Sequence, residues 1–559
     1  MAFQIPEEFI EGFAKAGQAY WSSLLSGSSE AGGIADGKNI AAAQQKYWQQ
    51  QMALWGQALG QPAEPVAEAV RGDRRFHGEA WKSHPWYRSL QQQYLVHAQL
   101  LTSLAVAAPL PRKEKHKLEF FTAQLVNALS PANFAATNPD VARQAMDSNG
   151  ESLRAGLSNL IEDLQHKRIS ITDRDAFEIG VNVAVSPGAV VFENDLLQLI
   201  QYAPSTKQVA ARPLVIVPPC INKFYILDLQ PENSFVRHAV ENGLTVFLVS
   251  WRNPESAQGH LRWDDYVEQG ALQALEVART ISGADQVNAL GWCVGGTILS
   301  TALAVARARG EEPAASLTLL TTMLDFEEPG DLGVFIDEEN VRQREQTIGQ
   351  GGIYPGGELG FVFQAMRAND LIWPYVVDNY LKGKSPPAFD LLYWNADATN
   401  LPGPMYAWYL RNMYLENNLV VPDKLVVCET RVDLGRIDMP SYVLATQEDH
   451  IVPWRAAYRS TQLLGGRTQF VLGASGHIAG VINPASKNKR SYRSGGKLNG
   501  DCAQWLETSQ ETPGSWWSHW FEWLSPHTGK KVAAPHALGH KKYPTIEPAP
   551  GRYVKVKAS

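Results

Sequence analysis

The most informative stretch of this chain is Gly291-Trp292-Cys293-Val294-Gly295-Gly296-Thr297. It follows a short apolar run, 287–290, and precedes a helical run, 298–309, that ends before Gly310. Glycine is favoured just past the end of a helix. The pattern predicts a sharp turn from a strand into a helix, with Cys293 at its apex.

A glycine-x-nucleophile-x-glycine turn between a strand and a helix is the nucleophile elbow of α/β-hydrolases. Gly291 and Gly295 keep side chains out of the turn, and Gly296 lets the helix lie close to the sheet. The thiol of Cys293 is predicted to project beside a helix N-terminus, which lowers the pKa of a thiol. A thiolate favours acyl exchange with thioesters. A buried cysteine beside a glycine-rich turn would give the same local pattern, so the remaining chain decides between these interpretations.

Composition indicates a globular protein of more than one domain. At 559 residues the chain is too long for one compact core, and its net charge of −7 gives no reason to expect nucleic-acid binding. Its four cysteines have no metal-ligand spacing, so we predict neither a metal site nor a disulfide scaffold. The absence of a signal peptide and of an apolar run of about 18 residues favours a cytoplasmic protein without a membrane span.

Residues 1–175 are predicted to form a mainly helical domain. One amphipathic stripe consists of Phe9, Phe13, Tyr20 and Leu24. A Ser/Gly-rich linker is expected at 22–33, followed by a helix at 44–59 that places Trp48, Met52 and Trp55 on one face. No catalytic spacing occurs here, and the expected role is packing, stability or interaction with a partner.

From residue 176 to 559, apolar strands alternate with helices, which predicts a parallel α/β sheet. Strands are expected at 196–202, 213–217, 244–249, 287–290, 317–323, 442–445 and 468–472, after a hairpin formed by 179–185 and 190–192. Between about 325 and 434 the alternation stops and aromatic residues accumulate, which predicts an inserted cap over the active site. The expected fold is therefore an α/β-hydrolase domain with a cap, preceded by the helical domain.

Two further residues stand where this fold keeps its catalytic partners. Asp449 follows the strand 442–445, and His477 follows the strand 468–472. The chain order of nucleophile, acid and base matches the fold, so Cys293, Asp449 and His477 are predicted to form a triad. His450, next to the acid, is interpreted as structural or as a secondary contact in the substrate pocket.

The oxyanion hole is expected from two backbone N–H groups. One belongs to Val294, and the other to the loop after the strand 213–217. Pro219 has no N–H to donate, so the backbone of Cys220 or Ile221 is the candidate. The side chain of Cys220 is expected to be a small buried filler. Ala479, two residues past the predicted base, is a candidate for setting the room available to the substrate side chain.

The C-terminal part contains a tryptophan-rich helix and a basic tail. Trp516, Trp520 and Trp523 share one helical face, and docking onto the domain core is the expected role. The tail from Lys530 to Ser559 is expected to be solvated.

The chain resembles the class I polyhydroxyalkanoate synthases of the PhaC family. The motifs that carry this resemblance are Pro218 to Lys223, Ser250 to Pro254, Gly291 to Gly296, Tyr375 to Tyr380, Asn400 to Pro404, Glu448 to Trp454, Gly476 to Pro484 and Glu547 to Val554. They cover roughly residues 175–559. Phe224 departs from the family pattern, because a second tyrosine is expected there.

The resemblance implies an acyltransferase that polymerises (R)-3-hydroxyacyl-CoA, chiefly with short side chains, and releases coenzyme A. It implies no separate cofactor, since coenzyme A is part of the substrate. It also implies a homodimer on cytoplasmic polymer granules, alongside phasins. In the family Asp449 is assigned to the triad and to activation of the substrate hydroxyl, and His477 is the simpler candidate for that base.

Two other function classes stay open at this point. A cysteine-dependent hydrolase of thioesters or lactones would use the same triad with water as the acceptor. A granule-coat or scaffold protein would carry a vestigial elbow, and the complete set of Cys293, Asp449 and His477 disfavours it.

Overall fold

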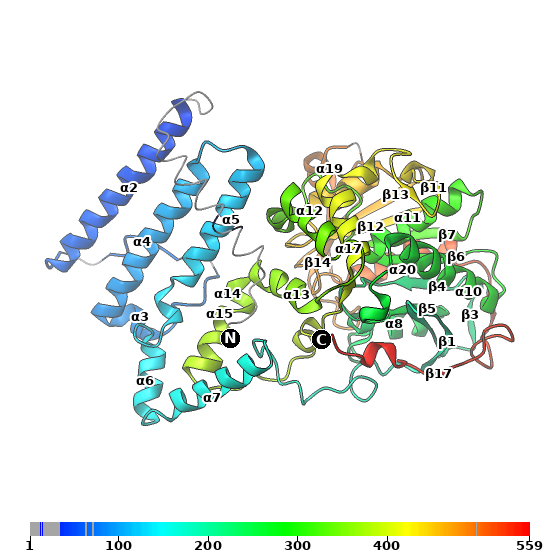
Figure 1. The fold of residues 1–559 in the computed structure, drawn as a ribbon, viewed down its shortest axis with the longest axis horizontal. Helices are drawn as coiled ribbons and strands as arrows, with labels where there is room; N and C mark the ends of the chain where they lie inside the picture. Colours follow the sequence, from blue (N-terminus) through cyan, green and yellow to red (C-terminus); the bar gives the residue numbers. More distant parts are fainter. Residues whose placement is uncertain are drawn as a thin grey trace. The chain divides into compact units, whose positions relative to one another are not determined.

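The computed structural model describes residues 12, 14, 34–61, 64–69, 72–498 and 500–558. Its contacts divide the chain into two units. Unit 1 comprises Met1–Asp173 with Phe361–Ala388, and unit 2 comprises Arg174–Gly360 with Phe389–Ser559 (Figure 1). The predicted stripe at Phe9 to Leu24 and the predicted linker lie outside the described residues.

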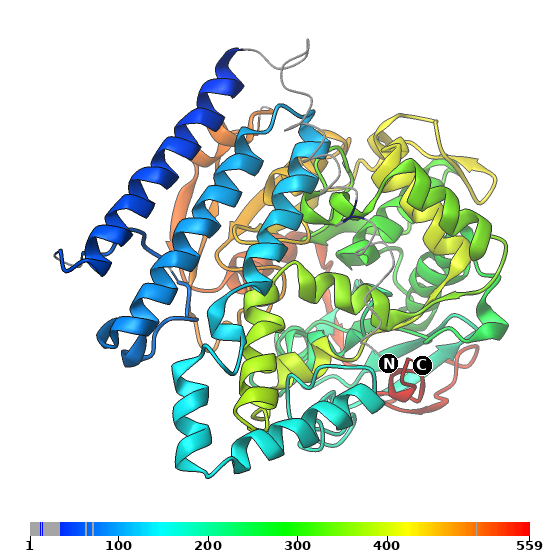
Figure 2. The same cartoon turned by 60° about the vertical axis from the view of Figure 1, so that its left-hand side comes forward.

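Unit 1 is built from helices. Its longest helices are α2 (Ile34–Ala58), α4 (Pro85–Ala107) and α5 (Arg112–Ala128), and α4 packs against both of the others (Figure 2). Shorter helices are α3 (Glu79–Ser83), α6 (Pro139–Asp147) and α7 (Glu151–Gln165). Phe76, Trp81 and Val96 lie in the core of this helical unit.

The segment Phe361–Ala388 was expected in the cap, yet it makes its contacts within the helical unit. The hydroxyl of Tyr380 donates to Asp163 Oδ2 at 2.7 Å, and the amide of Asn159 donates to the carbonyl of Asn379. Gly156 leaves no room for a Cβ against the backbone of Tyr380. These contacts attach α7 closely to the turn η6 (Val376–Leu381).

Unit 2 contains a large mixed sheet. In the described part of the chain its strand order is β15-β14-β13-β12-β7-β6-β4-β5-β2-β1-β17. The six strands from β13 to β5 run parallel, and the flanking pairs are antiparallel. The parallel strands are β4 (Leu214–Val217), β5 (Val246–Trp251), β6 (Val287–Trp292), β7 (Ala314–Leu320), β12 (Ser441–Thr446) and β13 (Thr468–Gly473). The flanking strands are β1 (Gly188–Glu193), β2 (Leu197–Tyr202), β14 (Ser491–Ser494), β15 (Gln510–Pro513) and β17 (Glu547–Pro548).

The predicted parallel strands are confirmed, but the predicted hairpin is wrong. Residues 179–185 form no strand and contain only an isolated bridge between Ile179 and Val183. Gly180 and Ala184 have positive φ values of 89° and 55°, which an extended strand cannot accommodate. The hairpin lies instead between β1 and β2.

Helices connect and cover the strands of unit 2. They include α8 (Phe235–Glu241), α10 (Gln273–Ser282), α11 (Val294–Ala308) and α20 (Trp516–Leu524). The predicted docking of the tryptophan-rich helix is confirmed, because Trp516, Trp517 and Trp520 are all buried. The expectation of a solvated tail is wrong, since β17 pairs with β1 and Val554 is fully buried in the core.

The chain between β7 and β12, where the cap is predicted, consists mainly of short helices. Those in unit 2 include η5 (Gly330–Phe335), α12 (Glu338–Thr347), α16 (Asp390–Asn395), α17 (Gly403–Tyr409) and the π-helical η7 (Leu410–Leu415). Within the described ranges, no helix has the length and hydropathy needed to cross a bilayer.

Candidate active site

Cys293 occupies a strained turn between β6 and α11. Its φ of 52° and ψ of −130° lie in a region that side-chain-bearing residues rarely adopt. The Cys293 N–H donates to the carbonyl of Leu320 on the neighbouring strand at 2.9 Å. The turn therefore holds the nucleophile candidate at the end of the sheet, where α11 begins.

The glycines of this turn are required by close packing. A Cβ on Gly291 would lie closer than 3.0 Å to the backbone of Gly296, and a Cβ on Gly295 would lie equally close to the carbonyl of Pro218. Gly296 packs in the same way against the side chain of Thr322. Side chains at these positions would push α11 away from the sheet.

Sheet register brings the ends of several strands to one edge. Gly291 pairs with Val217, and Trp292 pairs with Leu320. Because parallel strands present their carboxyl ends at the same edge, the loops after β4, β6, β12 and β13 meet there. The residues of the predicted triad come from three of these loops.

His477 and Asp449 form a buried pair. His477 Nδ1 lies 2.7 Å from Asp449 Oδ2, and the two side chains are 5% and 0% exposed. The other oxygen, Oδ1, accepts backbone N–H groups from Ile451 at 2.9 Å and Val452 at 2.8 Å. The carboxylate is thus held in one orientation, and its bond to Nδ1 leaves the other ring nitrogen available to the thiol.

Opposing influences act on the His477 imidazole. Burial lowers its pKa, but the negative charges of Asp449 and Cys293, with hydrogen bonds to both, raise it to about 10. The imidazole is therefore a ready acceptor for the thiol proton, because its cationic form is stabilised by charges on both sides. The structure brings Cys293, His477 and Asp449 together.

The loop after β4 carries the predicted oxyanion donors. Among the described residues, the N–H groups of Val294 and Ile221 donate to no other group of the protein, and the N–H of Cys220 bonds only with the sulfur of its own side chain. Burial, with a smaller contribution from Cys293, raises the pKa of the Cys220 thiol to about 12. The Cys220 side chain is fully buried and stays protonated, so only its backbone is suited to a role in chemistry.

Two tyrosines of the segment between β7 and β12, Tyr409 and Tyr414, are influenced by Cys293, and the sequence did not identify either of them as a site residue. Burial raises the pKa values of Tyr409 and Tyr414, and the charge at Cys293 adds to both shifts. Tyr409 stacks on Trp263 with ring centroids 5.3 Å apart, and Tyr414 contacts Phe326 edge-on at 4.9 Å. Their signal in the sequence was only an accumulation of aromatic residues in the insertion.

The two candidate pocket residues lie beside triad residues. Ala479 is half-buried in the turn after His477, and its carbonyl accepts a hydrogen bond from Arg490. His450 is half-buried next to Asp449. In the described part of the chain, no three His, Cys, Asp or Glu side chains gather as metal ligands would.

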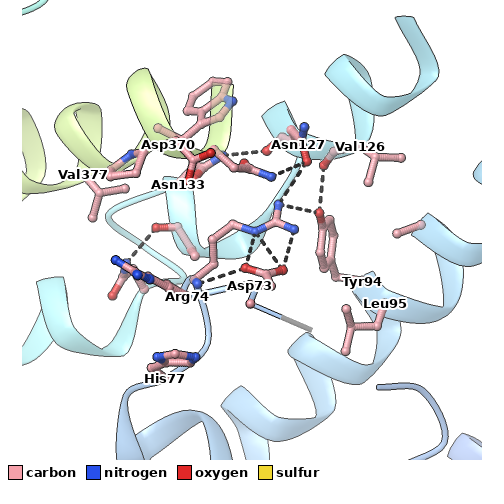
Figure 3. Close-up of a pocket in the computed structure, with 18 of the residues that line it drawn as sticks. Asp73, Arg74, His77, Tyr94, Leu95, Val126, Asn127, Asn133, Asp370 and Val377 are labelled. Atoms are coloured by element: carbon pink, nitrogen blue, oxygen red, sulfur yellow. Dashed lines mark hydrogen bonds and ion pairs between the residues drawn. The ribbon is translucent and has the colours of Figure 1, made fainter. Parts of the chain in front are cut away.

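A separate cavity of about 950 Å³ lies in the helical unit, and none of the triad residues lines it (Figure 3). Arg75 lines it and donates to both oxygens of Asp73, while the hydroxyl oxygen of Tyr94 accepts from the same guanidinium at 2.9 Å. Lys382, also in the lining, is paired with Asp378. Because these cations are neutralised by the protein's own carboxylates, the network is interpreted as structural.

Comparisons with known proteins agree with the fold and identify the family. The family model of the poly-beta-hydroxybutyrate polymerase (PhaC) N-terminus matches residues 72–239, and that of the alpha/beta hydrolase fold matches 213–484. The chain is 57% identical to the poly(3-hydroxyalkanoate) polymerase subunit PhaC of Cupriavidus necator, over 92% of this chain and 88% of the relative. It is 42% identical to the subunit of that name from Rhizobium meliloti, over 90% and 84%. The chain therefore belongs to the poly(3-hydroxyalkanoate) polymerase family, acyltransferase enzymes on an α/β-hydrolase fold.

Proposed function

We propose that this protein polymerises (R)-3-hydroxyacyl-CoA, chiefly with short side chains, into polyester with release of coenzyme A. The observation that carries the proposal is the buried pair of His477 and Asp449 beside a cysteine on a strained elbow. Family membership supports the substrate class, because the relatives are named as poly(3-hydroxyalkanoate) polymerases. The proposed chemistry uses side chains and backbone N–H groups of the protein and needs no cofactor.

In the acylation step, Cys293 attacks the thioester carbonyl of the substrate. His477 takes the thiol proton, the bond between Sγ and the carbonyl carbon forms, and the carbonyl oxygen becomes an oxyanion. The N–H groups of Val294 and of Cys220 or Ile221 stabilise that charge, at about 3 kcal/mol for each donor. The bond to coenzyme A then breaks, and its thiolate recovers the proton from His477.

In the elongation step, a hydroxyl of the chain or of the next monomer attacks the acyl group on Cys293. We assign the base to His477, because both oxygens of Asp449 already accept hydrogen bonds. The hydroxyl proton moves to the imidazole, the new ester forms, and the thiolate of Cys293 leaves. Asp449 stabilises the imidazolium in both steps.

Polymerisation requires that a substrate hydroxyl, and not water, attacks the acyl group on Cys293. Tyr409 stacks on Trp263 and meets Tyr414 edge-on, which forms an aromatic cluster, and the influence of Cys293 on the pKa values of both tyrosines supports a position of this cluster near the nucleophile. Enclosure by such surfaces excludes water and prevents hydrolysis of a reactive intermediate. This feature favours the polymerase over the thioesterase or lactone hydrolase, which needs water at the same carbon.

We also propose association with polymer granules in the cytoplasm as a homodimer, with phasins as neighbours. The exposed face of α2 supports the granule contact, because Trp48, Met52, Trp55 and Leu59 are 60%, 62%, 55% and 87% exposed. An exposed cluster of large apolar side chains is typical of surfaces that bind other apolar surfaces. Sedimentation of the purified protein tests the dimer.

The decisive experiment measures coenzyme A release from (R)-3-hydroxybutyryl-CoA by the wild type and by Cys293→Ala, with solvent extraction of the product. Release with high-mass polyester, both lost in the variant, is the expected result. Release with only free 3-hydroxybutyrate would identify a hydrolase. No release from a primed wild type would point to a scaffold protein.

A further inference from the structure

The loop that carries the predicted oxyanion donors begins with two prolines, so its first two residues have no backbone N–H that could hold the loop in place by a hydrogen bond. Pro218 and Pro219 directly follow β4, and neither has a backbone N–H. The N–H groups of Cys220 and Ile221 come next along the chain. Their direction depends on the preceding peptide planes, so the loop needs an anchor from another element.

Trp251, the last residue of β5, supplies this anchor. Its indole N–H donates to the carbonyl oxygen of Pro218 at 2.8 Å, and the bond is buried. The ring packs on Tyr266 with centroids 5.1 Å apart, and a Cβ on Gly270 would approach its edge to 2.9 Å. Because the ring is confined on two sides, its N–H points in one direction.

The same carbonyl also packs against the helix of the nucleophile. Gly295, in the first turn of α11, leaves no room for a Cβ against the carbonyl of Pro218. The Pro218 peptide therefore contacts both the Trp251 indole and the start of α11. Farther along the loop, the carbonyl of Ile221 accepts the N–H of Thr399 at 2.8 Å.

We infer that Trp251 is a positioning residue whose indole N–H orients the oxyanion-hole donors of the loop 218–221. The inference rests on the proposed function, which assigns those donors. Removal of the indole N–H should weaken stabilisation of the oxyanion and leave the reactivity of the Cys293 thiol unchanged. Loss of one oxyanion donor costs about 10²–10³-fold in rate, so loss of its orientation should cost a smaller factor, about tenfold.

The test compares two reactions of Cys293 in the wild type and in Trp251→Phe. Acylation by (R)-3-hydroxybutyryl-CoA in a single turnover passes through an oxyanion, and mass spectrometry measures the acyl-Cys293 peptide. Alkylation by iodoacetamide displaces iodide at a tetrahedral carbon and forms no oxyanion. The expected result is acylation slowed about tenfold with alkylation unchanged.

Trp520→Phe is the matched control, because it removes another buried indole N–H, which donates to Thr318 Oγ1 at 3.0 Å. In Trp520→Phe, the rates of acylation and of alkylation of Cys293 should both equal those of the wild type. Replacement of Trp251 by 3-benzothienylalanine, which exchanges only the N–H for sulfur, should reproduce the selective loss if the phenylalanine variant does not fold.

Equal slowing of both reactions in the isosteric variant, or unchanged acylation, would overturn the inference. A wild type whose Cys293 is alkylated but never acylated would overturn the proposed function, and the inference with it.

Discussion

His477 Nδ1 and Asp449 Oδ2 are 2.7 Å apart, in a pair that is almost completely shielded from solvent. The carboxylate is itself fixed by two backbone N–H groups, so the imidazole has one preferred orientation. The pair links the ends of β12 and β13 and holds a positive charge next to Cys293 whenever His477 is protonated.

Asp449→Asn should make stability less dependent on pH. The pKa of His477 is raised from 6.5 to about 10 in the folded protein, so the folded state binds this proton more tightly than the unfolded state. The resulting stabilisation is complete below about pH 6.5 and is lost as the pH rises through about 10. The thermal midpoint of the variant should therefore lie furthest below that of the wild type near pH 6.5, and the gap should close towards pH 10.

Differential scanning fluorimetry measures the difference in thermal midpoint between the wild type and Asp449→Asn from pH 6.5 to pH 10. A difference that does not change with pH would contradict the raised pKa of His477. At neutral pH the same variant should lose activity by about 10³-fold, because its imidazolium is no longer stabilised.

Gly295→Ala should separate the nucleophile from its oxyanion donors. The added methyl group would meet the carbonyl oxygens of Val217 and Pro218 at less than 3.0 Å, and these are backbone atoms that cannot rotate away. A displacement of about 1 Å costs about 10²-fold in rate. The coenzyme A release assay should show this loss, whereas Gly357→Ala, whose methyl group meets nothing within 4 Å, should have wild-type activity. Full activity of Gly295→Ala would show that α11 can shift without consequence.

Ala479→Trp should change monomer preference. Ala479 lies two residues past His477 and is half-buried, so a large side chain there would reduce the room for the substituent of the monomer. We expect the ratio of kcat/KM for 3-hydroxybutyryl-CoA to that for 3-hydroxyhexanoyl-CoA to rise by at least about tenfold, because the two substituents differ by two methylene groups and discrimination of a single methylene is worth about tenfold or more. An unchanged ratio would remove Ala479 from the substrate pocket.

Trp48→Ser combined with Trp55→Ser should release the protein from granules. Both indoles are more than half exposed on α2, and each large apolar side chain contributes about 1.5–3 kcal/mol when it is buried. The bound fraction in a sedimentation assay with purified polyester granules should fall by at least about tenfold. Gln49→Ser, on an exposed position of the same helix, is the control. Equal binding by the double variant would assign granule contact to another surface.

Arg75→Met should destabilise the helical unit. The side chain of Asp73 is 8% exposed and would lose its counter-ion, which typically costs about 3–5 kcal/mol when a buried pair is broken. The double variant Arg75→Met with Asp73→Leu should recover most of this loss, because it leaves no buried charge unpaired. Urea unfolding followed by circular dichroism compares the three proteins. A double variant as unstable as the single one would mean that the hydrogen bond to Tyr94 is the larger contribution.

Much of the fold of unit 2 could be predicted from the local pattern of apolar residues and glycines in the sequence. The parallel strands are short, mostly apolar runs, and the elbow glycines mark a place where a strand must turn directly into a helix. Because the carboxyl ends of parallel strands converge, the positions of Asp449 and His477 after their strands were sufficient to place them near Cys293. The hairpin prediction failed because alternation at 179–185 does not reveal the positive φ of Ala184.

Only the tertiary structure decided which distant segments meet. Tyr409 stacks on Trp263, Trp251 holds the loop of Pro218, and the segment Phe361–Ala388 joins the helical unit and not the expected cap. Each of these contacts joins residues far apart in the chain through loops that have no periodic pattern. Such contacts depend on the shape and hydrogen-bonding geometry of packed surfaces, and the spacing of residues along the chain does not encode them.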